Sequence, residues 1–329
     1  MSVTPVDTTR PTLAVPLLAA DRTAVEAALA AARSPATRRA YESQMGAWTR
    51  WAGERGYPLG PPAEPEHLAG WLVWLAQQGR SASSIGQAAA AISAAHADAG
   101  IPDPTQHQGV RLTLAGIRRQ VGTAPRRLAH PLTTDEIRRI VDGINRDSLR
   151  GKRDSALVLI GYAGALRRSE LAGLRTSDLS IRPAGIVVTI RRSKTDQVSA
   201  GQVVGIARGR SPVTDPVAAV RDWIGAAGLD GDRWLYPTIA WSDARPLCRP
   251  IRGEDVCRIL VRRAAAVGLG DLPISGHSLR AGHATTAARA GVPADRLART
   301  TRHRSLSSLA RYVRPAEALA DTSSADLGL

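Results

Sequence analysis

The sequence predicts a mainly α-helical protein with a small antiparallel β-sheet, divided into two modules. Apolar residues recur at helical spacing through most of the 329 residues, a length typical of about two domains. Two runs rich in β-branched residues, 185–192 and 202–207, flank the polar stretch 193–201, which is typical of a hairpin connection. A linker that ends in Arg126-Arg127 precedes these runs, so we expect the sheet in the second module only.

The first module follows an N-terminal arm. Residues 1–34 are rich in Thr, Pro and Ala without a sustained period, which predicts a flexible arm with one short helix over 23–32. Ser34-Pro35 then matches a helix start, with Ser as the cap and Pro in the first turn. The stretch 56–65, dense in Pro and Gly, ends that helix. The expected helices of this module cover 35–55, 66–78, 83–99 and 111–121.

Aromatic and histidine residues of the first module have ordinary structural interpretations. Its tryptophans stand at helical spacing among apolar neighbours, so we expect core residues rather than base-stacking ones: Trp48, Trp51, Trp71 and Trp74. The histidines expected on the surface, here and in the linker that follows, are His67, His96, His107 and His130.

The second module begins at Leu132 with a capping box, because Thr133 is followed three residues later by Glu136. The two β-rich runs interrupt an otherwise helical pattern. The tail after Arg314 has only a weak helical stretch, 316–320. The expected helices cover 135–145, 153–162, 168–174, 215–227, 253–267, 278–290, 294–300 and 305–312.

Composition restricts the class of function. The chain holds 44 Lys and Arg against 29 Asp and Glu, a net charge of +15, and most of the surplus falls in the second module. A hydrophobic content of 43% allows an ordinary core, so the positive charge indicates a polyanionic partner, most plausibly nucleic acid. No run is long and apolar enough for a membrane span, and no signal peptide is evident. Two cysteines predict reduced intracellular thiols rather than a disulfide framework.

Lysine is rare in this chain: Lys152 and Lys194 are the only lysines among the 44 basic residues. Arginine keeps its proton at ordinary pH, whereas lysine can release one. A lysine that persists among so many arginines is therefore a candidate for proton transfer, the alternative being survival by chance.

Two expected helix starts carry residues suited to phosphate. His277 and Arg280, three residues apart in Ser275-Gly276-His277-Ser278-Leu279-Arg280, share a helix face near its N-terminus, where free N–H groups favour an anion. Arg167 begins another helix, with Glu170 one turn later, and Lys194 lies at the tip of the expected hairpin. His303 stands at a turn nine residues before Tyr312, a distance that one helix can span. Each spacing alone is equally compatible with surface or core residues.

Taken together, the motifs match a family. The segments are GALRRSEL at 164–171, SKTDQ at 193–197, GHSLRAGHAT at 276–285 and HRSLSSLARYVR at 303–314, with SPATRRAYESQMGAWTRWA and VRLTLAGIRR in the first module. In this order the chain resembles the tyrosine recombinases, or phage integrases, of the two-domain Cre/Xer-like type, over residues 35–318. The resemblance implies a helical SAM-like core-binding domain at 35–125, a catalytic domain at 130–318, and a C-terminal tail at 319–329.

The resemblance also implies a role for each site residue. Arg167 and Arg280 would hold the scissile phosphate, Tyr312 would be the nucleophile and Lys194 the general acid. His277 and His303 would be further phosphate and proton-transfer ligands, and Glu170 a supporting residue that orients them. Arg38, Arg39, Arg118 and Arg119 are candidate contacts to the DNA backbone, or simply solvated residues. His283 matches no site position, and we expect it to be structural.

Elementary chemistry agrees with those roles. A phosphodiester is anionic, and two guanidinium groups can neutralise it with paired hydrogen bonds. A phenol has a pKa near 10, so the tyrosine needs nearby positive charge or a base before it attacks. The 5′-oxygen leaves poorly without a proton, which a lysine can donate and an arginine cannot. This chemistry needs no ATP, and the sequence shows no spacing typical of a metal site, so we expect neither cofactor nor metal.

The expected function is site-specific DNA recombination. Cleavage leaves a 3′-phosphotyrosine, and strand exchange through a Holliday junction would serve DNA integration, excision or resolution, as for a mobile element. The expected partners are double-stranded DNA sites and three further copies of the chain in a DNA-bound homotetramer, and the resemblance admits an accessory directionality protein. No membrane partner is expected, and the expected location is the prokaryotic cytoplasm, on DNA. The alternatives are a nicking-closing activity like that of type IB topoisomerases and a DNA-binding protein without catalysis.

One position departs from the family pattern. The residue before His303 is usually Gly in the family, and here it is Arg302. Glycine enters a left-handed turn freely, whereas arginine does so at a cost. We therefore expect either an altered loop at His303 or an additional phosphate contact from Arg302.

Overall fold

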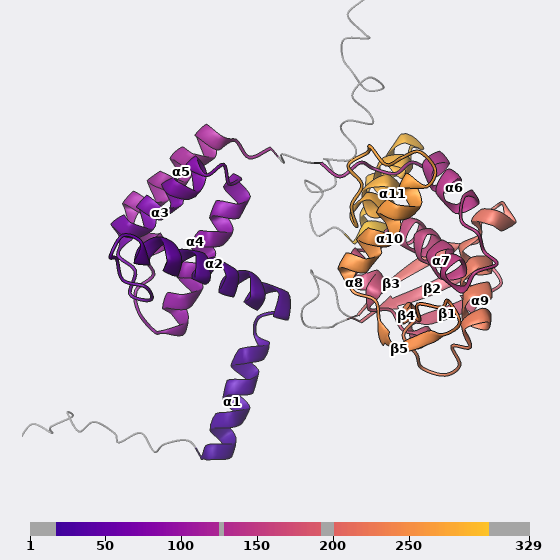
Figure 1. The fold of residues 1–329 in the computed structure, drawn as a ribbon, viewed down its shortest axis with the longest axis horizontal. Coiled ribbons are helices and arrows are strands. Elements are labelled where there is room, and N and C mark those ends of the chain that lie inside the picture. Colours follow the sequence, from indigo (N-terminus) through magenta and orange to yellow (C-terminus); the bar gives the residue numbers. More distant parts are fainter. Residues whose placement is uncertain (1–17, 125–127, 192–200, 303–329) are drawn as a thin grey trace, which may run out of the picture. The chain divides into compact units, whose positions relative to one another are not determined.

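The computed structural model describes residues 18–124, 128–191 and 201–302 (Figure 1). The chain divides into two compact units, Met1–Arg126 and Arg127–Leu329. Helices predominate in both units, and the second also holds two small antiparallel sheets, so the predicted fold class is confirmed. Within the described ranges, no helix is long and apolar enough to cross a membrane.

The described part of the first unit contains helices and no strand. Ser34 caps the long second helix, since its side-chain oxygen accepts the Thr37 N–H at 3.1 Å, as the sequence predicts for Ser34-Pro35. The helix expected over 111–121 begins earlier, because the ring of His107 accepts the N–H of Gly109 and caps it. The helices are α1 (Ala19–Ala31), α2 (Pro35–Gly53), α3 (Pro65–Gln77), α4 (Ala82–Asp98) and α5 (Gln108–Val121), with the 3₁₀ turn η1 (Pro104–Gln106) before α5.

Tryptophans of α2 and α3 form the centre of the first unit's core. Trp48 and Trp71 are fully buried, and their rings meet edge to face with centroids 5.4 Å apart. Trp51 is buried beside Trp48, and Trp74 is partly buried against the same cluster. The interpretation of these residues as core is confirmed, and edge-to-face pairing adds to their burial energy.

The expectation of a surface position is wrong for His96. This residue is 1% exposed on α4. Its Nδ1 donates to the Ile92 carbonyl at 2.8 Å, and its Nε2 accepts the Ala63 N–H at 2.9 Å. Because both ring nitrogens have backbone partners, burial leaves no polar group unsatisfied. The sequence carries no sign of the second contact, which joins residues far apart in the chain.

The second unit surrounds a three-stranded antiparallel sheet in the order β1-β2-β3. Val188 in the central strand lies opposite Leu179 on one side and Val204 on the other. The strands are β1 (Leu179–Arg182), β2 (Gly185–Ile190), β3 (Gln202–Ala207), and, in a separate sheet, β4 (Pro237–Ile239) and β5 (Pro246–Pro250). The helices are α6 (Thr134–Asp142), α7 (Leu149–Ala163), α8 (Arg168–Ala172), α9 (Pro216–Ala227), α10 (Gly253–Ala265), α11 (Ser278–Arg289) and α12 (Ala294–Thr301), with 3₁₀ turns η2 (Thr176–Asp178) and η3 (Pro212–Thr214).

Three strands of this unit were not expected from the sequence. β1 has only four residues, and β4 and β5 are bounded by prolines, which cannot donate to a ladder and argue against a strand. The pairing of β2 with β3 agrees with the expected hairpin. The connection itself, 192–200, lies outside the described residues, as does the helix expected over 305–312.

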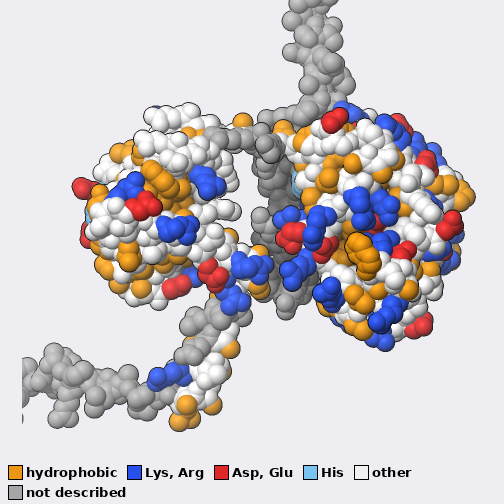
Figure 2. Space-filling model, viewed as in Figure 1, with side chains coloured by type: hydrophobic (Ala, Val, Ile, Leu, Met, Phe, Trp, Pro, Cys, Tyr) orange, Lys and Arg blue, Asp and Glu red, His pale blue; other side chains and the backbone are white. Residues whose placement is uncertain are grey.

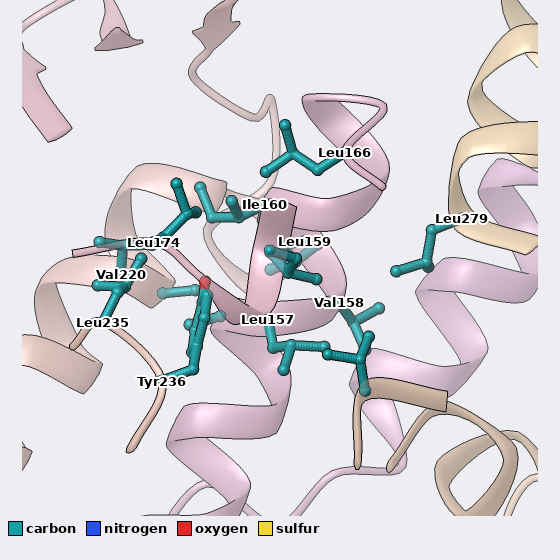
Figure 3. Packing of buried hydrophobic residues seen from close by; sticks show 14 of the residues in the cluster. Leu157, Val158, Leu159, Ile160, Leu166, Leu174, Val220, Leu235, Tyr236 and Leu279 are labelled. Carbon is teal, nitrogen blue, oxygen red and sulfur yellow. The ribbon is translucent and has the colours of Figure 1, made fainter. Parts of the chain in front are cut away.

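Helix α7 is the central element of the second unit's core, and its residues from Gly151 to Gly161 are buried with one exception, Lys152. Figure 3 shows Leu157 and Ile160 of this helix among side chains from several elements, with Val220 of α9 on one side and Leu279 of α11 on the other. Such a position requires apolar side chains around most of the helix, not a single face. The buried α7 therefore supplies the fixed base against which the site residues are held.

Candidate active site

The structure describes five of the residues that the sequence singles out for the site: Arg167, Glu170, His277, Arg280 and Arg302. It brings Arg167, Glu170, Arg280 and Arg302 into one hydrogen-bonded network. The other three predicted residues, Lys194, His303 and Tyr312, lie outside the described residues.

Arg167 and Glu170 are joined at the start of α8. Arg167 has an extended backbone and is the cap residue of this short helix. The carboxylate of Glu170 accepts the backbone N–H of Arg167 at 2.9 Å, as the Glu of a capping box does, and also accepts Arg167 Nη1 at 2.6 Å. The Glu170 side chain is fully buried, whereas that of Arg167 keeps 18% of its surface exposed. The pair therefore fixes both the backbone and the side chain of Arg167 while leaving the guanidinium partly accessible.

Arg280 reaches the same place from α11. It is only 1% exposed, and its Nη1 donates to the carbonyl of Ala165 at 2.8 Å. Ala165 has a φ of 47°, in the left-handed region that residues with a Cβ rarely adopt. This unusual turn between α7 and α8 presents a carbonyl to Arg280 directly before Leu166 and Arg167.

Three close approaches hold α11 in place. A Cβ at Gly161 of α7 would lie 2.7 Å from Leu279, and one at Gly282 would lie 1.9 Å from the carbonyl oxygen of Leu132. At the helix entrance, a Cβ at Gly276 would lie 3.0 Å from Cδ of Arg168. Glycine is therefore needed for steric reasons at positions 161 and 282. The approach at Gly276 shows that the entrance of α11 lies against α8.

Arg302 completes the network from the end of α12. This helix packs on α11 through Ala284, Ala288 and Leu297. Arg302 has φ 54° and ψ 45°, so it adopts the left-handed conformation that glycine would enter without cost. Its side chain is turned inward and is 4% exposed, and its Nη2 donates to Glu170 Oε2 at 2.6 Å. The sequence led us to expect an altered loop or an additional phosphate contact, and it did not predict this ion pair with Glu170.

The described network carries surplus positive charge, because it holds three guanidinium groups and one carboxylate, which Arg167 and Arg302 share while Arg280 donates to the Ala165 carbonyl. Burial lowers the pKa of Arg302 from its usual value, and the neighbouring Arg167 adds to that effect while Glu170 opposes it. Such a cluster is stabilised by an anion, and the doubly charged surplus suits a phosphodiester.

His283 borders the network without joining it. Its Nδ1 donates to the carbonyl of Tyr162 at 2.9 Å, and its ring meets that of Tyr162 edge to face. Burial lowers the pKa of His283 below 6.5, and the nearby cations Arg280 and Arg302 lower it further, against the opposing effect of the hydrogen bond. His283 is thus a structural link between α7 and α11.

His277 stands at the entrance of α11. It is exposed, it is the cap residue of the helix, and it lies one turn before Arg280. Its backbone N–H donates to Ser275 Oγ at 3.2 Å.

The candidate DNA contacts of the first unit are all exposed. Arg38 and Arg39 lie near the start of α2, and Arg118 and Arg119 lie in the last turn of α5. Figure 2 shows Lys and Arg side chains spread over the visible face of each unit, with many on the second. Exposed arginines are available for phosphate contacts.

Sequence reasoning missed two features of the network. The first is the carbonyl of Ala165, because the segment GALRR contains no signal that predicts an alanine in the left-handed conformation. The second is the ion pair between Arg302 and Glu170, which lie in different motifs. The unusual Arg before His303 was the only available signal for the second feature.

The model of the phage integrase family matches residues 130–318. The chain belongs to the phage integrase family. An integrase/recombinase xerD homolog of Selenomonas ruminantium is 29% identical to this integrase over 280 residues, which are 84% of this chain and 81% of that protein. Recombinase cre of Escherichia phage P1 is 28% identical over 248 residues, 70% of each protein.

Solved structures show the same fold. A crystal structure of a lambda integrase (75–356) dimer bound to a COC′ core site covers 90% of this integrase and 95% of that chain, with a TM-score of 0.59 and 18% identity. A lambda integrase tetramer bound to a Holliday junction covers 84% and 72%, with a TM-score of 0.56 and 16% identity. The resemblance to tyrosine recombinases is therefore confirmed, and with it the prediction of a site-specific recombinase enzyme acting on DNA.

Proposed function

We propose that this integrase cleaves and rejoins DNA strands through a covalent 3′-phosphotyrosine at Tyr312. One observation carries the proposal: Arg167 and Arg280 come from different motifs, and both are held by the turn that runs from Ala165 to Glu170. Two arginines fixed by separate elements are a preorganised site for one phosphate, because neither has to be reoriented when the anion binds. The sequence supplies the rest of the site.

In the proposed first step, Tyr312 attacks the scissile phosphorus. A bond forms between the phenolic oxygen and phosphorus, the bond from phosphorus to the 5′-oxygen breaks, and that oxygen leaves as a hydroxyl with a proton from Lys194. His277 and His303 assist by binding the phosphate and accepting the phenolic proton. Arg167 and Arg280 hold the nonbridging oxygens, where negative charge increases in the transition state. Positive charge around the phenol favours its ionised form.

In the second step, a 5′-hydroxyl attacks the phosphotyrosine and releases Tyr312. The phosphodiester energy is conserved in the covalent link, so rejoining needs no ATP. If the incoming hydroxyl belongs to another duplex, the strands are exchanged, and two such exchanges pass through a Holliday junction. The products are those of integration, excision or resolution.

Four active protomers on two duplexes are required for that sequence of exchanges. We propose that the chain assembles as a homotetramer on DNA, which the lambda integrase tetramer on a Holliday junction supports as a precedent. An accessory protein would set the direction of exchange. The relatives from a bacterium and a bacterial phage support action on DNA in a prokaryotic cytoplasm. We assign Arg38, Arg39, Arg118 and Arg119 to the DNA backbone, because they are exposed cations on the first unit.

Covalent trapping tests this function. Purified protein is incubated with nicked duplexes tiled across the DNA flanking its own gene, and an SDS-resistant adduct is sought. We expect an adduct with wild-type protein and with the control Tyr41→Phe, and none with Tyr312→Phe. Specific binding to a duplex without an adduct would favour the non-catalytic alternative.

A second assay separates recombination from topoisomerase-like activity. Two duplexes that carry the trapped site, one of them labelled, are incubated with the protein, and recombinant strands are measured. We expect strand exchange whose rate depends steeply on protein concentration, because several protomers must assemble. Relaxation of a supercoiled plasmid without exchange would contradict the proposal.

A further inference from the structure

Arg302 is not one of the two arginines assigned to the phosphate, and its backbone conformation is unfavourable for an arginine. It ends α12 with φ 54° and ψ 45°, a conformation that glycine adopts without strain and that an arginine adopts at an energetic cost. A residue at such a position persists when its side chain supplies something that glycine cannot. The question is therefore what the Arg302 side chain does.

Its two terminal nitrogens are occupied by the protein. Nη2 donates to Glu170 Oε2 at 2.6 Å and lies 3.5 Å from the carbonyl oxygen of Ala165. Nη1 lies 3.2 Å from the carbonyl of Thr300 and 3.4 Å from that of Gly164. The side chain is 4% exposed. These contacts are with the frame of the site, so the additional phosphate contact that the sequence suggested is not the arrangement that this structure favours.

Through Glu170, Arg302 acts on Arg167. The carboxylate is fully buried and gives Oε1 to Arg167 Nη1 and Oε2 to both Arg302 Nη2 and the Arg167 backbone N–H. A buried carboxylate with a single cation would pair with that cation on both oxygens. A second guanidinium divides the negative charge, and Arg167 therefore retains donors and positive charge for a phosphate.

Through Ala165, Arg302 reaches the other arginine. The Ala165 carbonyl accepts Arg280 Nη1 at 2.8 Å and lies at the limit of hydrogen-bond distance from Arg302 Nη2. Arg302 thus contacts the acceptor that fixes Arg280 and the acceptor that fixes Arg167. One side chain thus touches both holding points.

We propose that Arg302 is a positioning residue for DNA cleavage, which holds the Ala165 carbonyl and the Glu170 carboxylate so that Arg280 and Arg167 bind the scissile phosphate together. The inference rests on the proposed function, since it concerns the phosphate site of that reaction. It assigns no contact between Arg302 and DNA. A residue that acts in this way changes the rate of the chemical step more than it changes DNA affinity.

The principal test uses Arg302→Gly, Arg302→Met and Arg302→Lys in the full chain. The single-turnover rate of adduct formation at saturating protein is measured on a trapped nicked duplex, together with the Kd for the same duplex. We expect Gly and Met to slow adduct formation by about 10- to 100-fold with Kd changed by less than about twofold. Lys keeps the charge but not the fork, so it should recover part of the rate lost by Met. The matched control is Arg299→Met, in the same helix but 70% exposed and paired only with exposed Asp295, which should keep the wild-type rate.

The Arg302→Gly variant distinguishes a positioning role from a role in ending α12. Glycine relieves the backbone strain, so a residue needed only to end α12 would give wild-type or faster cleavage, and that result overturns the proposal. A weaker Kd with an unchanged rate at saturation would also overturn it, in favour of a direct phosphate contact.

A double-mutant cycle with Glu170→Gln tests the route of action. If Arg302 acts through Glu170, Arg302→Met should slow cleavage much less in the Glu170→Gln background than in wild type. Additive losses would overturn this part of the proposal. The same cycle can be measured as the urea midpoint of unfolding without DNA, which does not depend on the proposed function. If wild type forms no adduct, coupling between positions 170 and 302 in this measurement still supports the pairing. Additive changes in the midpoint would overturn it.

Discussion

The carbonyl oxygen of Ala165 accepts a hydrogen bond from Nη1 of Arg280, at 2.8 Å. This contact joins the turn after α7 to the first turns of α11, and it depends on the left-handed conformation of Ala165. The acceptor of this bond is a backbone carbonyl, so the bond does not neutralise the positive charge of Arg280. The position of one phosphate-binding arginine is thus set by the shape of a turn.

Replacing Arg280 with lysine should separate charge from geometry. A lysine keeps the positive charge but has no planar fork, so it cannot donate to Ala165 and to a phosphate in the same geometry. We expect Arg280→Lys to slow adduct formation by about 10²- to 10³-fold, the range for loss of one preorganised donor. The exposed Arg289→Lys, in the same helix, is the control and should keep its rate. Equal rates for the two variants would contradict the role of the fork.

Two glycine substitutions should change stability in opposite directions. A Cβ at Gly282 would lie 1.9 Å from the Leu132 carbonyl, a backbone atom that cannot move aside, whereas at Gly225 of α9 it meets nothing within 4 Å. We expect Gly282→Ala to lower the free energy of unfolding by about 1–3 kcal/mol or more. Gly225→Ala should raise it by up to about 1 kcal/mol through helix propensity. Urea unfolding measures both, and a neutral Gly282→Ala would show that α11 can move away from Leu132.

The buried His283 predicts a dependence of stability on pH. Its pKa is lowered below 6.5 in the fold, mainly by burial and further by Arg280 and Arg302, so the unfolded chain binds a proton that the folded chain does not. The free energy of unfolding should therefore fall as pH decreases below about 6.5, by at most about 1.4 kcal/mol per pH unit from this group. His283→Gln should make the fall between about pH 7.5 and 5.5 shallower. The same slope in both proteins would show that folding does not change the pKa of His283.

Burial predicts opposite outcomes for two tryptophans of the second unit. Trp223 is fully buried and its Nε1 donates to the Leu235 carbonyl at 2.7 Å, whereas Trp241 is 96% exposed. We expect Trp223→Ala to lower the free energy of unfolding by about 3–5 kcal/mol. Trp241→Ala should change it by less than about 0.5 kcal/mol. A large loss at Trp241 would indicate a contact with a part of the chain outside the described residues.

Salt dependence tests the proposed backbone contacts of the first unit. If Arg38 and Arg39 each neutralise one phosphate, the double variant Arg38→Ala/Arg39→Ala should reduce the slope of log affinity against log salt concentration by about 0.9 for each contact. The measurement is fluorescence anisotropy with a labelled duplex over a series of salt concentrations. The double variant Arg118→Ala/Arg119→Ala should reduce the slope by the same amount. An unchanged slope would assign these residues to the solvated surface.

The sequence predicts most helices of both units, because their apolar periodicity and their caps are local. Ser34 and Thr133 illustrate this, since each caps the helix that its motif announces. The short strands β1, β4 and β5 were missed because too few residues carry a period, and prolines bound two of them. Local signals thus decide what can be predicted of the fold.

Long-range contacts could not be predicted in the same way. His96 was expected at the surface, and its burial depends on a backbone N–H from Ala63, which no local pattern connects to it. The sequence likewise identifies Arg167, Glu170 and Arg280 as candidates by family resemblance, but the carbonyl that joins them to Arg302 requires the folded turn at Ala165. The identities of site residues were available from motifs, whereas their mutual support was not.

The pairing of Arg302 with Glu170 restricts the order in which mutations can accumulate during evolution. A chain with Gly at position 302 can acquire Arg only while an acid stands at position 170, since a buried cation without a carboxylate would lower stability by about 3–5 kcal/mol. Once Arg302 is present, Glu170 is retained for the sake of two arginines instead of one. In descendants of this sequence, Glu170 should therefore be lost only together with Arg302 or after it.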